Sequence, residues 1–146
     1  MSTPLLSSWV FWALLSAVFA AMTAIFGKIG ITGINSDFAT LLRTVVVLVS
    51  LALILYATRQ YQSLSSISAR SYLFLVLSGL ATGASWICYY RALQLGQASL
   101  VAPVDKLSVV IVAVLGVTFL GEKLDIRQWV GIGLITVGVV VLAWRR

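Results

Sequence analysis

Residues 38–58 read FATLLRTVVVLVSLALILYAT, an apolar run that contains a single charged side chain, Arg43. A membrane-spanning helix needs ~20 mostly apolar residues, because the hydrocarbon core is ~30 Å thick and a helix rises about 1.5 Å per residue. Four further stretches of similar length and composition lie at residues 9–26, 72–93, 100–120 and 128–144. The sequence therefore predicts an all-α, polytopic membrane protein with five transmembrane helices in one domain over residues 1–146.

The composition of the 146-residue chain agrees with a membrane protein. Apolar side chains make up 61% of the chain and charged ones 10%, with a mean hydropathy of +1.08, whereas a soluble domain is about half apolar and a quarter charged. The net charge of +6 comes from lysines and arginines that stand mostly at helix ends, where they reach toward lipid headgroups. We therefore expect the lipid bilayer as a partner and no nucleic acid.

The scarcity of reactive side chains limits the possible chemistry. The chain has no histidine and one cysteine, Cys88, which excludes an intrachain disulfide, a cysteine-cluster metal site, common zinc sites and histidine-based acid–base catalysis. We expect no metal, no cofactor, no catalytic residue and no enzymatic activity. The first 27 residues carry no charge, so we expect the first apolar run to be a retained helix rather than a signal peptide.

The positive charges between the apolar stretches are balanced across the membrane. Five spans place the chain ends on opposite faces, and four basic residues then fall on each face. One face carries Arg59, Arg70, Lys123 and Arg127, and the other carries Lys28, Arg91, Arg145 and Arg146. The positive-inside rule gives this chain no preferred orientation. We therefore expect insertion in both orientations, which allows two opposite copies to form an inverted pair.

Short connections with recognisable capping residues join the predicted helices. Ser36-Asp37 is a suitable N-cap pair for the second helix, Ser99 for the fourth, and Asp125 with Gln128 forms a capping-box pattern for the fifth. Gly121 suits the C-terminus of the fourth helix. Pro103 falls in the first turn of the predicted fourth helix, where it needs no hydrogen-bond donor, and it could equally mark a local break.

Polar and small side chains recur at helical spacing in several predicted helices. A small or polar residue in a spanning helix usually faces another helix or a cavity. Close helix packing explains the small residues alone, whereas the aromatic residues in the third helix favour the wall of a cavity; interfacial anchoring is the alternative for Tyr89 and Tyr90. The stripes are Ser16, Ala20, Thr23 and Gly27; Ser78, Thr82, Ser85 and Tyr89; and Gly79, Gly83, Trp86 and Tyr90.

The fifth predicted helix has a different character. Apart from Thr136 it has no polar interior residue, but it carries three glycines. Gly131 and Gly138 are seven residues apart on one face, where they allow close approach of another backbone. This pattern predicts that Gly131 and Gly138 form a dimer interface.

Charged side chains inside the apolar segments indicate a functional site. A charge at the centre of a bilayer costs ~2.5–3.5 kcal/mol on insertion scales. Arg43 and Asp105 each lie roughly 7–8 Å below the membrane surface, in helices that enter from the same face, and Arg91 and Lys106 belong to the same layer. Asp105 and Ser108 are expected to share a face of the fourth helix, whereas Asp105 and Lys106 point about 100° apart. We expect Asp105 to pair with Arg43 or Arg91; the alternative is a structural salt bridge with outward-reaching basic side chains.

Three segments of the chain resemble the EamA-type domain of the drug/metabolite transporter superfamily: FATLLRTVVVL at 38–48, ALQLGQASLVAPVDKLSVV at 92–110 and FLGEKLDIRQWVGIGLITVGVVVL at 119–142. Most such proteins have ten helices in two oppositely oriented EamA domains, and this chain resembles one inverted-repeat unit. The resemblance implies export of small metabolites or toxic compounds. The glycine spacing in the last helix resembles small multidrug-resistance proteins, which are antiparallel dimers, but their first-helix carboxylate is missing here, so their proton-coupled mechanism does not transfer.

Together these patterns predict a small-molecule transporter of the prokaryotic plasma (inner) membrane. It would work by alternating access as an antiparallel homodimer, or with a related five-helix chain. The non-transporting alternative is a membrane subunit or assembly partner of another complex. A channel is a further alternative, which only flux kinetics distinguish from a carrier. The candidate substrate-binding or coupling residues are Arg43, Ser85, Trp86, Tyr89, Arg91, Asp105 and Lys106.

Overall fold

The computed structural model describes residues 8–144, and within them it is helical with no strand. Five helical stretches are long and apolar enough to cross a membrane, as predicted. They are α1 (Trp9–Gly30), α2 (Ser36–Thr58), α3 (Ala69–Leu95), the pair α4 (Ala98–Asp105) and α5 (Ser108–Phe119), and α6 (Ile126–Ala143), with a short 3₁₀ turn η1 (Leu64–Ser66) between α2 and α3. Arg145 and Arg146 lie outside the described residues.

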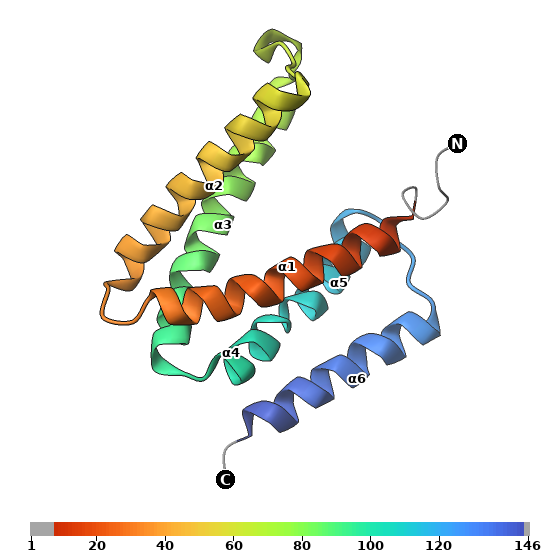
Figure 1. Ribbon diagram of the computed structural model, residues 1–146. Helices are drawn as coiled ribbons and strands as arrows, with labels where there is room; N and C mark the ends of the chain where they lie inside the picture. Colours follow the sequence, from red (N-terminus) through yellow and green to blue (C-terminus); the bar gives the residue numbers. More distant parts are fainter. Residues whose placement is uncertain (1–7, 145–146) are drawn as a thin grey trace. The chain divides into compact units, whose positions relative to one another are not determined.

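The chain divides into two compact units. The central unit, Gly27–Leu95, holds the last turn of α1 together with α2 and α3. In it α2 and α3 form a hairpin and run side by side (Figure 1). The terminal unit, whose described part covers 8–26 and 96–144, holds the rest of α1 with α4, α5 and α6, and in it α6 packs against both α4 and α5.

The first helix continues beyond its predicted end at residue 26. It runs to Gly30, and its last turn packs against the end of α3: a Cβ atom at Gly27 would lie 3.3 Å from the Tyr90 hydroxyl and 3.7 Å from Leu93 Cδ1. Tyr90 and Leu93 are buried. At Gly27 the small residue therefore allows close packing of two helices. This is one of the two explanations given for the small and polar residues of the first helix; the other was a cavity wall.

Helix α2 begins at Ser36, a residue that was predicted to cap the helix rather than to lie in it. Asn35 is the N-cap, and its side-chain oxygen accepts hydrogen bonds from the backbone N–H groups of Asp37 (2.9 Å) and Phe38 (3.1 Å). The prediction of a Ser36-Asp37 cap was therefore wrong. Asn35 takes the extended conformation of a cap residue, which leaves Ser36 in the helix and the Asp37 carboxylate available for another contact.

The fourth membrane span is broken, as one of the two interpretations of Pro103 predicted. Helix α4 begins at Ala98 with Gln97 at the N-cap and no side-chain capping bond. Ser99 consequently lies inside the helix and does not cap it, and Pro103 lies in the second turn rather than the first. After Pro103 the chain tightens, because the backbone N–H of Lys106 bonds to the carbonyl of Pro103 and that of Leu107 to Val104, each at 3.0 Å. Asp105 and Ser108 are therefore not on one continuous helix.

Two predicted signals around the last loop are confirmed. Gly121 has a φ of +68° directly after the end of α5, a left-handed conformation that glycine adopts without strain. The capping box of α6 is complete: the Gln128 backbone donates to Asp125 Oδ1 (2.8 Å) and the Asp125 backbone to Gln128 Oε1 (2.7 Å). These contacts fix where the last two helices end and begin.

Candidate functional site

Arg43 lies against two aromatic rings of α3 in the central unit. Its guanidinium carbon is 4.1 Å from the centre of the Trp86 ring and 5.5 Å from that of Tyr90. A cation over an aromatic face gains roughly 0.5–2 kcal/mol, most when water is excluded. Arg43 and Trp86 are half-buried, and Tyr90 is buried at 5% exposure. The structure thus brings together two of the predicted site residues, Arg43 and Trp86, and adds Tyr90.

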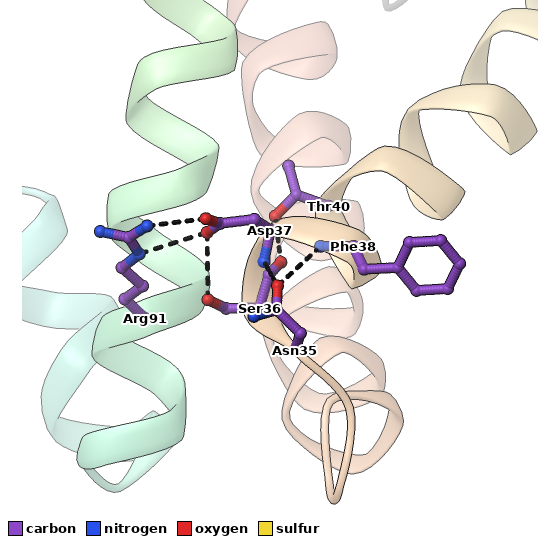
Figure 2. A network of polar contacts seen from close by, with 6 residues as sticks. All are labelled: Asn35, Ser36, Asp37, Phe38, Thr40 and Arg91. Atoms are coloured by element: carbon purple, nitrogen blue, oxygen red, sulfur yellow. Dashed lines mark hydrogen bonds and ion pairs between the residues drawn. The ribbon is translucent and has the colours of Figure 1, made fainter.

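A second arginine of the central unit is paired with an acid. Arg91 Nη2 donates to Asp37 Oδ2 at 2.7 Å and Arg91 Nε to Asp37 Oδ1 at 3.2 Å (Figure 2). The Ser36 hydroxyl donates to the same carboxylate at 3.2 Å. This two-bond geometry is the strong form of an arginine–carboxylate pair. It joins the end of α3 to the start of α2.

The pairing of Arg91 corrects the expectation that Asp105 is its possible partner. Sequence reasoning treated Asp37 only as a capping residue and missed it as a counter-ion. One signal was available, because Asp37 is the only acidic residue before Asp105 in the chain. Five basic residues between positions 27 and 95 therefore have one acid to share.

The loop between α1 and α2 is tied to the end of α3. The Lys28 amine donates to the carbonyl of Leu93, and the Gln94 side-chain amide donates to the carbonyl of Ile34 at 2.7 Å. A helix leaves its last carbonyl groups without intrahelical partners, and Lys28 supplies one for α3. A hollow of about 430 Å³ lies here, lined by Lys28, Ile31, Thr32, Gly33, Ile34 and Gln94.

The other polar residues of α3 that the sequence singled out differ in their exposure. Ser85 is exposed, and Tyr89 is half-buried. At Gly79 and Gly83 no heavy atom of residues 8–144, outside the backbone of α3 itself and the adjacent residues, lies within 4 Å of a Cβ position. The described structure therefore leaves the surroundings of this stripe as a prediction, except at Trp86 and Tyr90.

Asp105 and Lys106 belong to the terminal unit and mark the break between α4 and α5. The Lys106 amine lies 3.4 Å from Asp105 Oδ2. This contact joins two neighbouring residues at the point where α4 ends. Since Arg43 lies in the central unit, the expected pairing of Asp105 with Arg43 stays a prediction.

The predicted dimer glycines lie on α6 without close neighbours. Outside the backbone of α6 itself and the adjacent residues, no heavy atom of the described chain lies within 4 Å of a Cβ position at Gly131 or Gly138, and the same holds for Gly133. Among residues 8–144 no cluster of three or more histidine, cysteine or acidic side chains is placed to hold a metal ion. Cys88 has an exposed side chain.

The sequence profile of the EamA-like transporter family matches residues 7–144 of the chain. The chain belongs to this family. With its five apolar helical spans it is a multi-pass integral membrane protein, and family membership indicates a membrane transporter or flippase.

Relatives of the EamA-like chain carry names consistent with this membership. A Sinorhizobium sp. protein named "Uncharacterized transporter in cobO 3'region" is 61% identical over 93% of the chain and 96% of its own length. A Bacillus subtilis protein, "Uncharacterized transporter YxxF", is 26% identical over 99% of the chain but 45% of its own length. A Proteus mirabilis protein, named as a probable 4-amino-4-deoxy-L-arabinose-phosphoundecaprenol flippase subunit, ArnE, is 26% identical over 60% of the chain and 78% of its own length. No solved structure matches the chain.

Proposed function

We propose that this EamA-like chain carries small molecules across a prokaryotic plasma membrane as a non-enzymatic exporter, by alternating access in an antiparallel homodimer. The observation that carries the proposal is the position of Arg43, a charged residue within a spanning helix that lies on the face of Trp86. A charge at such a position is expensive to insert, and ionisable residues inside membrane segments commonly mark substrate or ion pathways. Aromatic walls with a few polar groups are typical of small-molecule sites.

The proposed transport residues come from both units. Trp86 and Tyr90 hold the guanidinium of Arg43, while Asp37 orients Arg91 next to the start of α2. In the terminal unit the break between α4 and α5 presents Asp105 and Lys106. Broken helices near polar side chains are a recurrent feature of transporter sites, because unwound backbone groups are available to a ligand. The residues proposed to act in substrate binding or coupling are Arg43, Ser85, Trp86, Tyr89, Arg91, Asp105 and Lys106.

Pairing of two opposite copies is supported by three observations. The basic residues divide four against four between the two faces, so neither orientation is preferred. The B. subtilis relative is about twice as long as the stretch that this chain matches, which fits a function that needs two such units. Gly131 and Gly138 offer a surface on α6 for close approach of another helix.

A second candidate function is that of a subunit in a complex with a different chain. The observation that favours it is the name of the P. mirabilis relative, which describes a flippase subunit. In that case the purified chain alone would insert into membranes but move no compound. A related five-helix partner would then occupy the place that we propose for the second copy.

Vesicle flux tests the proposed function. The purified chain is reconstituted into phosphatidylcholine vesicles, and uptake of labelled carboxylates, phosphates, amines and neutral sugars is measured against protein-free vesicles. We expect protein-dependent, saturable flux of at least one class. If no class moves faster than in protein-free vesicles, the homodimeric transporter is wrong and the subunit function is favoured. Linear, unsaturable flux would indicate a channel.

Cysteine labelling tests the inverted pair. Cys88 is exposed and must first be replaced by serine; a single cysteine is then placed at Ser65 in the η1 turn of the connection between α2 and α3. An impermeant thiol reagent added to intact cells should label about half of the protein, and the remainder should react after lysis, because the positive-inside rule gives no bias. Labelling of all or none of the molecules in intact cells would contradict dual insertion.

A further inference from the structure

The guanidinium of Arg43 has aromatic neighbours but no hydrogen-bond partner within residues 8–144. Its cation contacts are the rings of Trp86 at 4.1 Å and Tyr90 at 5.5 Å, and the ion pairs of the described chain are Arg91–Asp37 and Lys106–Asp105. An arginine carries five N–H donors in the plane of its guanidinium. Those of Arg43 are not used by the described protein groups, although the residue lies inside a membrane-spanning helix.

The central unit has no acid left for Arg43. Between positions 27 and 95 the only carboxylate is Asp37, and both of its oxygens accept hydrogen bonds from Arg91. Lys28 donates to the carbonyl of Leu93. The remaining basic residues of the unit, Arg59 and Arg70, flank the connection between α2 and α3 at the helix ends, where they can reach the headgroup region.

Stacking on aromatic rings leaves the edge of a guanidinium available. The guanidinium carbon of Arg43 lies over the Trp86 ring and near the Tyr90 ring, and the planar N–H donors of a guanidinium match the spacing of two oxygens in a carboxylate or phosphate. Tyr90 is buried and Trp86 is half-buried, so water has limited access to the side of Arg43 that faces these rings. The arrangement resembles a preformed receptor for an oxyanion rather than a surface cation.

We infer that Arg43 determines substrate specificity, and that the molecule carried by this chain bears an oxyanion group, a carboxylate or a phosphate, which Arg43 binds edge-on while Trp86 and Tyr90 hold its face. This inference rests on the proposed function and names its substrate class. The oxyanion can belong to a soluble metabolite or to a lipid headgroup. The competing explanation is that Asp105 neutralises Arg43.

Binding of simple probes tests the inference. Thermal unfolding of the protein is followed in phosphatidylcholine nanodiscs with rising concentrations of benzoate or phenyl phosphate, and separately with benzylammonium or benzyl alcohol. A ligand that binds only the folded state raises the unfolding temperature. We expect the two anions to raise it and the cation and the alcohol to have no effect. In Arg43→Gln the apparent affinity for the anions should fall roughly 10- to 100-fold, the loss typical of a charge-assisted hydrogen-bond pair.

Two further variants distinguish a loss of anion binding from a loss of folding. Arg43→Lys keeps the positive charge but loses the planar fork, and should bind the anions with intermediate affinity. Arg70→Gln is the matched control, because Arg70 also lies near an aromatic ring, 5.9 Å from Phe74, at the other end of α3. It should bind the anions as the unaltered protein does. The unfolding temperature without ligand reports whether each variant is folded.

A second set of nanodiscs, in which phosphatidylglycerol replaces part of the phosphatidylcholine and no soluble probe is present, tests an anionic lipid headgroup as the source of the oxyanion; the phosphate of phosphatidylcholine is neutralised by its own choline. Stabilisation by phosphatidylglycerol that is lost in Arg43→Gln, without any response to soluble anions, would support the inference and assign the oxyanion to a lipid headgroup. An equal response in Arg43→Gln and in the unaltered protein, or an equal response to benzylammonium and benzoate, would overturn it. Anion binding that appears only in Asp105→Asn would also overturn it, because the Asp105 carboxylate would then be the ion-pair partner of Arg43 in the unaltered protein.

The inference and the proposed function can fail separately. If vesicles move amines or sugars but the protein binds no anion, the transporter stands and the oxyanion specificity is wrong. If anions bind through Arg43 but nothing crosses the membrane in vesicles, the oxyanion site stands and the homodimeric transporter is wrong.

Discussion

The contacts inside the central unit differ from those inside the terminal unit. In the central unit, side chains join segments that are far apart in the sequence: Arg91 binds Asp37 across 54 residues, and Gln94 binds the carbonyl of Ile34 across 60. In the terminal unit, the hydrogen bonds of Thr118, Thr136 and the Asp125 capping box join residues three or four apart, and α6 packs on α4 and α5.

This difference separates a unit whose distant segments are joined by side-chain hydrogen bonds from a unit in which the hydrogen bonds named above are local. Directional hydrogen bonds and cation–aromatic contacts hold Arg43 and Arg91 at set positions, which suits a binding site. Apolar helix packing in lipid has little hydrophobic driving force and depends on shape, which suits an assembly surface with open glycines on α6. We therefore assign recognition mainly to the central unit and assembly to α6.

Substitution of Asp105 tests whether the terminal unit also contributes to transport. We expect Asp105→Asn and Arg43→Ala each to reduce vesicle flux roughly 10- to 100-fold, because each removes a charge-assisted interaction in a low-dielectric setting. In the double variant the losses should be less than additive if the two side chains act together. Flux of Asp105→Asn at the level of the unaltered protein would restrict transport to the central unit and leave Asp105 as the structural partner of Lys106.

The glycine face of α6 tests the assignment of assembly. Gly131→Leu with Gly138→Leu should greatly reduce the crosslinked dimer in detergent without loss of membrane insertion, because the added side chains keep a second helix at a distance. Gly133→Leu is the matched control, since Gly133 lies on another face of the same helix and also has no neighbour within 4 Å. A dimer fraction that does not change in the Gly131/Gly138 variant would exclude this face as the interface.

The packing of Gly27 against α3 gives a smaller expected effect and tests the rigidity of the central unit. Gly27→Leu places side-chain atoms where the Tyr90 hydroxyl lies 3.3 Å from the Cβ position. We expect a loss of about 1–3 kcal/mol in unfolding free energy, as is usual for overpacking. Gly30→Leu, in the same helical turn but with no described atom outside its own stretch of helix within 4 Å of the Cβ position, should leave the stability nearly unchanged. Equal stability of both variants would contradict the close approach of α1 and α3.

The sequence predicted the features that depend on local composition. Apolar runs gave five spans, and Gly121 with the Asp125–Gln128 box gave the last helix boundaries, because these signals act within a few residues. The cap of α2 was misassigned because Asn35, Ser36 and Asp37 are all good capping residues, and only the backbone conformation selects Asn35. The Arg91–Asp37 pair escaped prediction because it joins residues 54 positions apart, and helix periodicity carries no information about partners on another helix.

The most direct test of the account compares two arginines of the central unit, Arg43 on Trp86 and Arg70 near Phe74. Flux of the compounds that the unaltered protein moves is measured in phosphatidylcholine vesicles for Arg43→Gln and Arg70→Gln, at matched reconstitution levels. We predict that Arg43→Gln lowers flux about tenfold or more while Arg70→Gln stays near the unaltered value, because only Arg43 lies within the proposed site. Equal flux of both variants, whether unchanged or lost, would contradict a transport site centred on Arg43.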